Sequence, residues 1–160
     1  MSAAQLMADL RRLRSLNFHA QSAKATGWNG QGRGGVSIEI PSPDVIVFRE
    51  TGRWHPAGRE AHPSLQFSNI YRWTLVDEQT VRLEHLRLGL EQPVFLVDLQ
   101  ADTADGWASV TPHQCSADQY VLTVSAQPDG IGMQWTITGP KKDEHIAYRY
   151  GYASPSHAEA

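Results

Sequence analysis

The sequence has a single cysteine and no long apolar run, and each absence narrows the class of protein. Because Cys115 is the only cysteine among 160 residues, no disulfide can form within the chain, which excludes a secreted scaffold held by disulfides. No apolar run approaches the ~20 residues that a membrane-spanning helix needs. The N-terminal segment carries Asp9 among alternating polar and apolar residues, so it lacks the apolar core of a signal peptide. These features predict a cytoplasmic protein with no membrane partner.

The chain also has little net charge. Its formal charge of −3 at pH 7 gives no general attraction to nucleic acid, which binds basic surfaces. The cluster Arg11, Arg12 and Arg14 is typical of the solvent-facing side of a helix. With 41% hydrophobic and 19% charged residues, the composition is globular, and the length suits one domain over residues 1–160. We therefore expect a single globular domain with no nucleic-acid partner.

The hydrophobic periodicity changes once along the chain. Residues 3–16 predict an amphipathic helix, because Leu6, Leu10 and Leu13 fall on one stripe. From Phe18 onward, apolar and polar residues alternate as they do in strands. We expect strands at 18–25, 36–40, 45–51, 65–76, 80–86, 94–100, 107–114, 120–126, 133–138 and 145–152, followed by a flexible tail at 153–160.

About ten short antiparallel strands with little helix predict an all-β fold, either an up-and-down barrel or a sandwich. Closure into a barrel removes exposed strand edges, so we favour a barrel over residues 18–152, with the N-terminal helix packed across it or its mouth. The glycine-rich stretch 27–35 contains Gly30-x-Gly32, but a strand follows it where a dinucleotide-binding turn needs a helix. A hairpin or a bulged edge is the expected structure there.

Two polar motifs lie among the last strands, His113-x-Cys115-x-x-Asp118-x-Tyr120 and Gly139-Pro140-x-Lys142-Asp143. They follow, in matching order, the shorter motifs Glu50-x-Gly52, Tyr71-x-Trp73, Leu83-Glu84-His85-Leu86-Arg87 and Pro93-Val94-Phe95-Leu96-Val97-Asp98-Leu99. Together these motifs resemble an uncharacterised single-domain family, a domain of unknown function with a lipocalin-like or calycin barrel, over roughly residues 36–150. The resemblance implies a barrel with an internal cavity and no established activity. Phe48 and Asn69 depart from it, since many relatives carry tyrosine and arginine there.

The bulkier face of each strand is expected to point into the barrel, which gives an aromatic interior that includes Phe95 and Tyr150. Such a lining is typical of a small-molecule pocket and equally of a filled core. Glu50 follows Ile46 and Phe48 on one strand face, so its carboxylate would enter the interior, where Arg72 or Arg149 could pair with it. We expect the barrel to bind a small apolar or amphipathic ligand through Glu50, Tyr71, Trp73, His85, His113, Trp135, Lys142 and Tyr148.

Two other functions remain open. The first is an enzyme of the isomerase, lyase or hydrolase type that uses Glu50 or His113 for proton transfer. The second is a module without catalytic activity, with a filled barrel, that forms a homodimer.

Specific chemistry is weakly indicated. His113 and Cys115 share a strand face, which is the minimum for a cysteine nucleophile activated by histidine, and Asp118 could orient the histidine. The polar turn after Cys115 instead favours the simple end of a strand. Two ligands are too few for zinc. Haem binding through His145 is a further alternative, although we expect no cofactor. Lys142 stands either in a rigid hairpin turn or beside an anionic group of a ligand.

Overall fold

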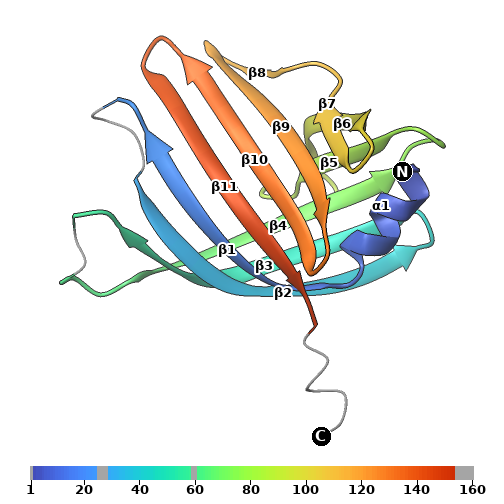
Figure 1. Cartoon of the computed structure of the whole chain (residues 1–160), viewed down its shortest axis with the longest axis horizontal. Helices are drawn as coiled ribbons and strands as arrows, with labels where there is room; N and C mark the ends of the chain where they lie inside the picture. Colours follow the sequence, from blue (N-terminus) through green and yellow to red (C-terminus); the bar gives the residue numbers. More distant parts are fainter. Residues whose placement is uncertain (1, 25–28, 59–60, 154–160) are drawn as a thin grey trace, which may run out of the picture.

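The computed structural model describes residues 2–24, 29–58 and 61–153, which form one helix followed by strands (Figure 1). Residues 154–160 of the expected tail lie outside this part of the chain. The elements are α1 (Ala3–Leu10), β1 (Leu13–Ser22), β2 (Gly30–Ser42), β3 (Val45–Pro56), β4 (Leu65–Leu75), β5 (Val81–His85), β6 (Val94–Thr103), β7 (Gly106–Ser109), β8 (His113–Cys115), β9 (Asp118–Gln127), β10 (Gly130–Gly139) and β11 (Lys142–Tyr152).

Ten of the strands close into an antiparallel barrel. Neighbours in sequence pair from β1 to β7, β7 pairs with β9, and β9, β10 and β11 lead back to β1. The predicted all-β barrel of about ten strands is confirmed. Every strand of the ring has two neighbours, although β4 pairs with β5 only over residues 71–75 and β7 pairs with β9 at three positions.

The helix is shorter than predicted, because it ends at Leu10 and Leu13 already belongs to β1. The pairing of β1 with β11 shifts register between Leu13 and Ser15, so this irregularity brings Leu13 and Leu16 to the same buried face. A spacing of three is also the spacing of a helix stripe. The irregular start of β1 therefore has the same apolar spacing as a helix, which is why the predicted helix extended to residue 16.

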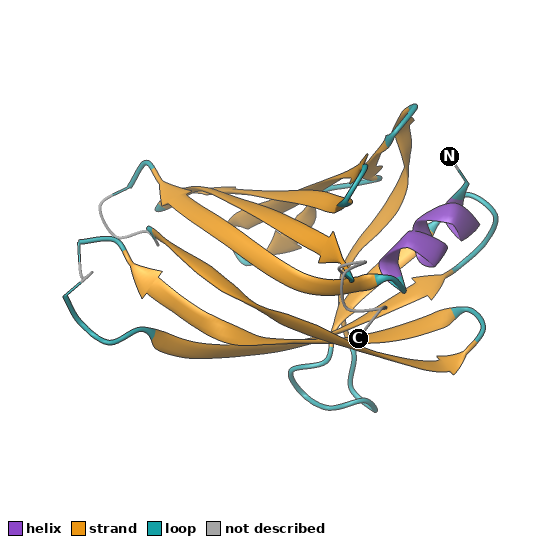
Figure 2. Cartoon of the chain, turned by 60° about the horizontal axis from the view of Figure 1, so that its bottom comes forward, coloured by secondary structure: helices purple, strands orange, loops and turns teal. Residues whose placement is uncertain are grey.

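Helix α1 lies against one end of the barrel and packs on β4 and β10 (Figure 2). The Ser2 side chain caps it by accepting a hydrogen bond from the Gln5 N–H. Leu6, Met7 and Leu10 are each at most 3% exposed and belong to the barrel core. Burial of a side chain of this size stabilises by about 1.5–3 kcal/mol, so the helix is held by its packing.

The predicted strand 107–114 is two strands, and both pair with β9. Strand β7 pairs with residues 123–125 of β9, and β8 pairs with residues 118–120. Pro112 stands between them and has no N–H to donate. The Ser109 hydroxyl, at the end of β7, donates to the carbonyl of Leu122 and accepts from its N–H.

The glycines of the glycine-rich stretch that the structure describes lie inside β2, paired on both sides with β1 and β3. The expectation of a hairpin or bulged edge is therefore wrong for Gly30–Gly35, and Gly27 lies outside the described residues. Glycine is needed at position 32, because a Cβ atom there would stand 2.4 Å from Cε1 of the Phe18 ring. The Phe18 ring thus packs directly on the backbone of β2 at Gly32.

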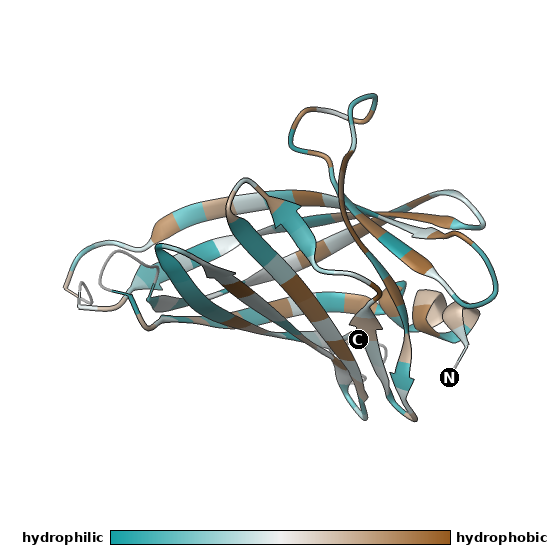
Figure 3. Ribbon diagram, turned by 90° about the horizontal axis from the view of Figure 1, so that it is seen from above, coloured by the Kyte–Doolittle hydropathy of each residue, from teal (hydrophilic) through white to brown (hydrophobic). Residues whose placement is uncertain are grey.

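Hydrophobic and hydrophilic residues alternate along the strands, which sorts them between the interior and the surface (Figure 3). Phe95 breaks the expected alternation. A register shift between Leu83 and Glu84 places Phe95 opposite Glu84 on the outer face, where the phenyl group is 45% exposed. The prediction that Phe95 lines the interior is wrong, because one extra residue reverses the face of every position that follows it.

Candidate functional site

The barrel interior has a sealed half and an open half. Beside α1, inward-facing side chains such as Leu99, Trp107 and Ile131 are at most 2% exposed. In the other half Ala20, Ile137 and Glu144 are buried, but most of the inward-facing side chains are only half-buried. Most of these half-buried side chains are aromatic: Phe18, Trp54, Phe67, Tyr71, His85, Trp135, Ile146 and Tyr148. Side chains that face inward and still reach solvent line an open recess, which we call the aromatic recess.

Glu50 of β3 lies at the floor of this recess and is 1% exposed. The Tyr150 hydroxyl of β11 donates to Glu50 Oε2 over 2.5 Å, and Asn69 Nδ2 of β4 donates to Oε1 over 3.3 Å. Burial raises the pKa of the Glu50 carboxyl, and the two hydrogen bonds oppose that rise. A buried carboxylate is costly unless it is bonded in this way.

Neither arginine that the sequence offered as a partner for Glu50 reaches it. Arg72 Nε lies 2.9 Å from Glu84 Oε1, and Arg149 Nη2 donates to Gln127 Oε1 over 3.1 Å. Both arginines alternate with inward-facing residues and therefore point outward. The predicted ion pair is wrong, and the carboxyl group has neutral partners instead.

Three tyrosine side chains surround the carboxyl group of Glu50. Burial is the main reason that the pKa values of Tyr71, Tyr148 and Tyr150 all rise, and the negative charge of Glu50 raises each of them further. The Tyr148 and Tyr150 rings stack with centroids 5.6 Å apart. All three phenols therefore stay neutral, and they can donate hydrogen bonds but carry no charge.

A cavity of about 10 Å³ lies among these side chains, which is room for one water-sized group. The recess is therefore narrow beside Glu50. The side chains around the cavity include five of the predicted ligand-binding residues, and the full set is Phe48, Glu50, Tyr71, Trp73, Leu83, Met133, Trp135, Tyr148 and Tyr150.

The other three predicted ligand-binding residues do not line this cavity. His85 packs its ring edge-on to Tyr71 with centroids 4.9 Å apart, while its Nδ1 accepts the Arg87 N–H over 2.9 Å. Burial, followed by the charge of Arg87, lowers the pKa of His85. His113 lies on β8, outside the ring of ten strands, in edge contact with Phe95 and Tyr120.

Lys142 joins the two polar motifs of the sequence. Its Nζ lies 3.3 Å from Asp118 Oδ2, and this hydrogen-bonded contact raises the pKa of Lys142. A Cβ atom on Gly139 would stand 2.0 Å from Asp118 Oδ1, so glycine is required for the carboxylate to fit. The two motifs thus fasten the β8–β9 hairpin to the β10–β11 hairpin, and the ammonium group already has a partner within the chain.

The catalytic and metal alternatives find little support in the geometry. Cys115 is exposed at the end of β8, and a two-residue turn with Ser116 at φ 54° leads into β9. Asp118 pairs with Lys142 and so does not cap that turn through its side chain. His145 is exposed on the outer face, 3.7 Å from Asp143, which removes it as a ligand inside the barrel. In the part of the chain that the structure describes, no three His, Cys, Asp or Glu side chains are grouped closely enough to hold a metal ion.

Sequence reasoning missed two partners of Glu50. Asn69 shares the inward face of β4 with Tyr71 and Trp73, and Tyr150 shares that of β11 with Tyr148, so strand alternation placed both inside. The register between neighbouring strands decides which inward-facing residues contact Glu50. In the register of β3 and β4, Glu50 lies opposite Asn69. The sequence pattern does not define these registers.

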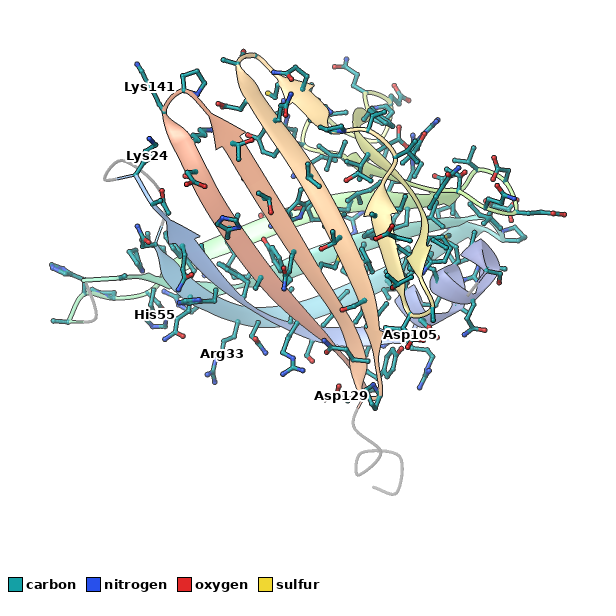
Figure 4. The ribbon with its side chains drawn as sticks, turned by 45° about the horizontal axis from the view of Figure 1, so that its top comes forward. Lys24, Arg33, His55, Asp105, Asp129 and Lys141 are labelled. Carbon is teal, nitrogen blue, oxygen red and sulfur yellow. The ribbon has the colours of Figure 1, made fainter. Side chains whose placement is uncertain are left out.

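The outer face carries a larger but open depression of about 1110 Å³ over β1, β2 and β11. Arg33, His55 and Arg149 line it and are exposed, and Arg33 and His55 project away from the barrel (Figure 4). Arg33 lies directly opposite Arg53 on the neighbouring strand. This face encloses nothing, so the candidate site is the aromatic recess.

The fold and the site together define a small antiparallel barrel with one end closed by a helix and the other open as an aromatic recess. The chain belongs to a family of unknown function, DUF6314, whose model matches residues 14–151. This range includes both polar motifs and every residue of the recess, and the predicted membership of an uncharacterised family is confirmed. The comparison with curated proteins gives no match. Among the described residues, no helix is long and apolar enough to cross a membrane.

Proposed function

We propose that this protein binds a small, partly apolar molecule in the aromatic recess, with one polar group of that molecule directed at Glu50. The supporting observation is the combination of half-buried, inward-facing aromatic rings with a fully buried carboxyl group at their floor. Ligand pockets typically consist of apolar and aromatic walls with a few polar groups that orient the ligand.

The size of the recess limits the ligand. Because the cavity beside Glu50 takes only one water-sized group, the rest of the molecule would lie against the half-buried rings of Tyr148 and Trp135 nearer to solvent. Trp135 also contacts Tyr120 with ring centroids 6.5 Å apart, and Tyr120 contacts His113 at 6.0 Å. A ligand that extends along these rings would bring His113 and Lys142 within its reach as outer contacts.

A binding assay with two matched variants tests this proposal. Ile146 faces inward beside Trp135, whereas the adjacent Ala147 is exposed on the outer face. Tryptophan at position 146 should obstruct the recess, and tryptophan at position 147 adds the same bulk outside. N-phenyl-1-naphthylamine, whose fluorescence rises in apolar sites, should bind the wild type and Ala147→Trp but not Ile146→Trp. Equal fluorescence with both variants would refute binding in the recess.

An enzyme on the same recess is a second proposal, and the raised pKa of Glu50 favours it. A carboxyl group whose pKa is raised by burial is suited to proton transfer, as an isomerase or lyase requires. Substrate screening tests it, and Glu50→Gln should abolish any turnover that depends on this carboxyl. His113 lacks a comparable setting, because it lies outside the barrel ring.

The cellular setting and assembly of the protein remain part of the proposal. A free, exposed Cys115 suits the reducing cytoplasm. The apolar side chains exposed at Leu88, Leu90 and Phe95 are the surface on which a homodimer would form. Sedimentation of the wild type and of Leu88→Lys distinguishes a dimer through this surface from a monomer.

A further inference from the structure

Among the residues that the structure describes, Glu50 has no cationic partner. The polar groups that face it are Asn69 and Tyr71 from β4 and Tyr148 and Tyr150 from β11, and all of them are neutral. In the described part of the chain, no arginine, lysine or histidine forms an ion pair with Glu50. A carboxylate that is taken out of water without a counter-charge is among the costliest buried groups.

Two cationic side chains on the strands that form the recess are already engaged. Lys142 pairs with Asp118, and Arg72 pairs with Glu84 on the outer face. The carboxyl group of Glu50 is therefore available to a charge that arrives with a ligand.

We propose that the ligand carries a primary ammonium group and places it in the cavity beside Glu50. This inference rests on the proposed function, since it names the chemical class of the molecule in the same recess. An ammonium group donates three hydrogen bonds, and a charge-assisted bond to a carboxylate is about twice as strong as a neutral one.

The cavity volume selects among organic cations. A primary ammonium nitrogen with its hydrogens is about as large as water, which matches the cavity of about 10 Å³. A trimethylated ammonium carries three further methyl groups and does not fit without displacing side chains. The recess should therefore prefer a primary amine to its trimethylated form.

The walls of the recess suit the apolar part of such a molecule. Tyr148 and Trp135 present aromatic surface beside the cavity, and Trp73 and Phe48 close its inner side. Aromatic faces attract cations as well as apolar groups, so these rings favour a protonated amine with a hydrocarbon body. A carboxylate ligand would instead meet the like charge of Glu50.

Calorimetric titration with three related probes tests the inference: 2-phenylethylamine, 2-phenylethanol and trimethyl(2-phenylethyl)ammonium. At about pH 8, where Glu50 is most fully ionised, the primary amine should bind at least about tenfold more tightly than the alcohol. It should also bind more tightly than the trimethylated cation. In Glu50→Gln the preference for the amine over the alcohol should vanish, whereas Glu39→Gln, which alters an exposed carboxylate paired with Arg49, should preserve it.

A pH series on the wild type keeps the test decisive if Glu50→Gln does not fold. Pairing with a cation favours the ionised carboxylate, so the affinity for the amine should increase as the pH rises through the raised pKa of Glu50. The affinity for the alcohol should change much less. Among the neighbours of Glu50 the tyrosines stay neutral, but His85, whose pKa is lowered, also loses positive charge as the pH rises and would strengthen amine binding in the same direction. The pH series is therefore repeated with His85→Gln, in which the trend due to Glu50 should persist.

The outcomes separate the two proposals. Equal or tighter binding of the alcohol, with no effect of Glu50→Gln, would overturn the ammonium inference and leave binding in the recess intact. Equal binding of the primary and trimethylated amines would also overturn it. If none of the three probes and no N-phenyl-1-naphthylamine bound, the proposed function itself would fail.

Discussion

Replacement of Tyr150 by phenylalanine should destabilise the protein in a manner that depends on pH. The substitution removes one oxygen atom and leaves the ring, which is stacked on Tyr148 and edge-on to Phe48 at 5.6 Å. The main loss is the hydrogen bond from the Tyr150 hydroxyl to Glu50 Oε2. A hydrogen bond to a charged group is worth about 1.5–3 kcal/mol, so the variant should lose about that much stability above neutral pH.

The sign of the pH dependence follows from the direction of the Glu50 shift. Burial raises its pKa above the ordinary value of 4.5, so the stability associated with this group is fully present below that value and is lost as the pH rises through the raised pKa. The Tyr150 hydrogen bond lowers the pKa, and its removal raises the pKa further. The difference between wild type and variant should therefore be larger at high pH, and it should shrink toward about 1 kcal/mol, the value of a neutral hydrogen bond, as the pH falls through the raised pKa of Glu50.

Urea denaturation at about pH 5 and about pH 8 measures this difference, and thermal unfolding at about pH 8 should show a midpoint lower by roughly 3–12 °C. Tyr152→Phe is the matched control, because Tyr152 lies on the same face of β11, where its ring is covered by Arg12. A loss of the same size at both pH values would refute the view that Tyr150 stabilises an ionised carboxylate. So would a loss equal to that of the control.

Three further substitutions test the fold. Gly32→Ala should destabilise by about 1–3 kcal/mol in urea denaturation, because its methyl group meets the Phe18 ring at 2.4 Å; an unchanged midpoint would contradict that contact. Leu10→Ala should cost about 2–5 kcal/mol, since Leu10 is fully buried where the helix closes the barrel, and a loss below that range would mean that the helix is dispensable. Arg33→Glu should increase stability by about 0.2–1 kcal/mol at low salt, because it replaces a like-charged pair with Arg53 by an opposite one, and the gain should disappear in high salt.

The number and approximate positions of the strands could be predicted because alternation of apolar and polar residues is a local property. Prediction from this alternation failed where a β-bulge adds one residue to a strand. The register shift next to Leu13 makes a strand resemble a helix stripe, and the shift at Phe95 reverses the expected inward and outward faces. No single side chain marks either shift in the sequence. The division of one expected strand into β7 and β8 was foreshadowed by Pro112, which cannot donate to a sheet.

The candidate site could be predicted in part for the same reason. Tyr71 and Trp73 share a face, and alternation alone already places Arg72 on the opposite face, so the expected pairing of Arg72 with Glu50 contradicted the pattern itself. The separation of His113 from the recess could not be foreseen, because it depends on β8 lying outside the ring. Strand order between distant segments is a tertiary property, and the alternation of single residues does not contain it.

The short strand β7 makes the barrel a ring with one weak seam. It meets β9 through the pairs of Gly106, Trp107 and Ala108. At one end the Ala126 N–H donates to the Asp105 carbonyl, and at the other the Ser109 hydroxyl holds both backbone groups of Leu122 in place of a further strand residue. Local opening begins where few backbone bonds must break, so amide exchange should be fastest along this line and should quicken in Ser109→Ala. Because this seam lies in the sealed half, beside the buried Trp107, exchange along it reports on the opening of the closed end of the barrel and not of the aromatic recess.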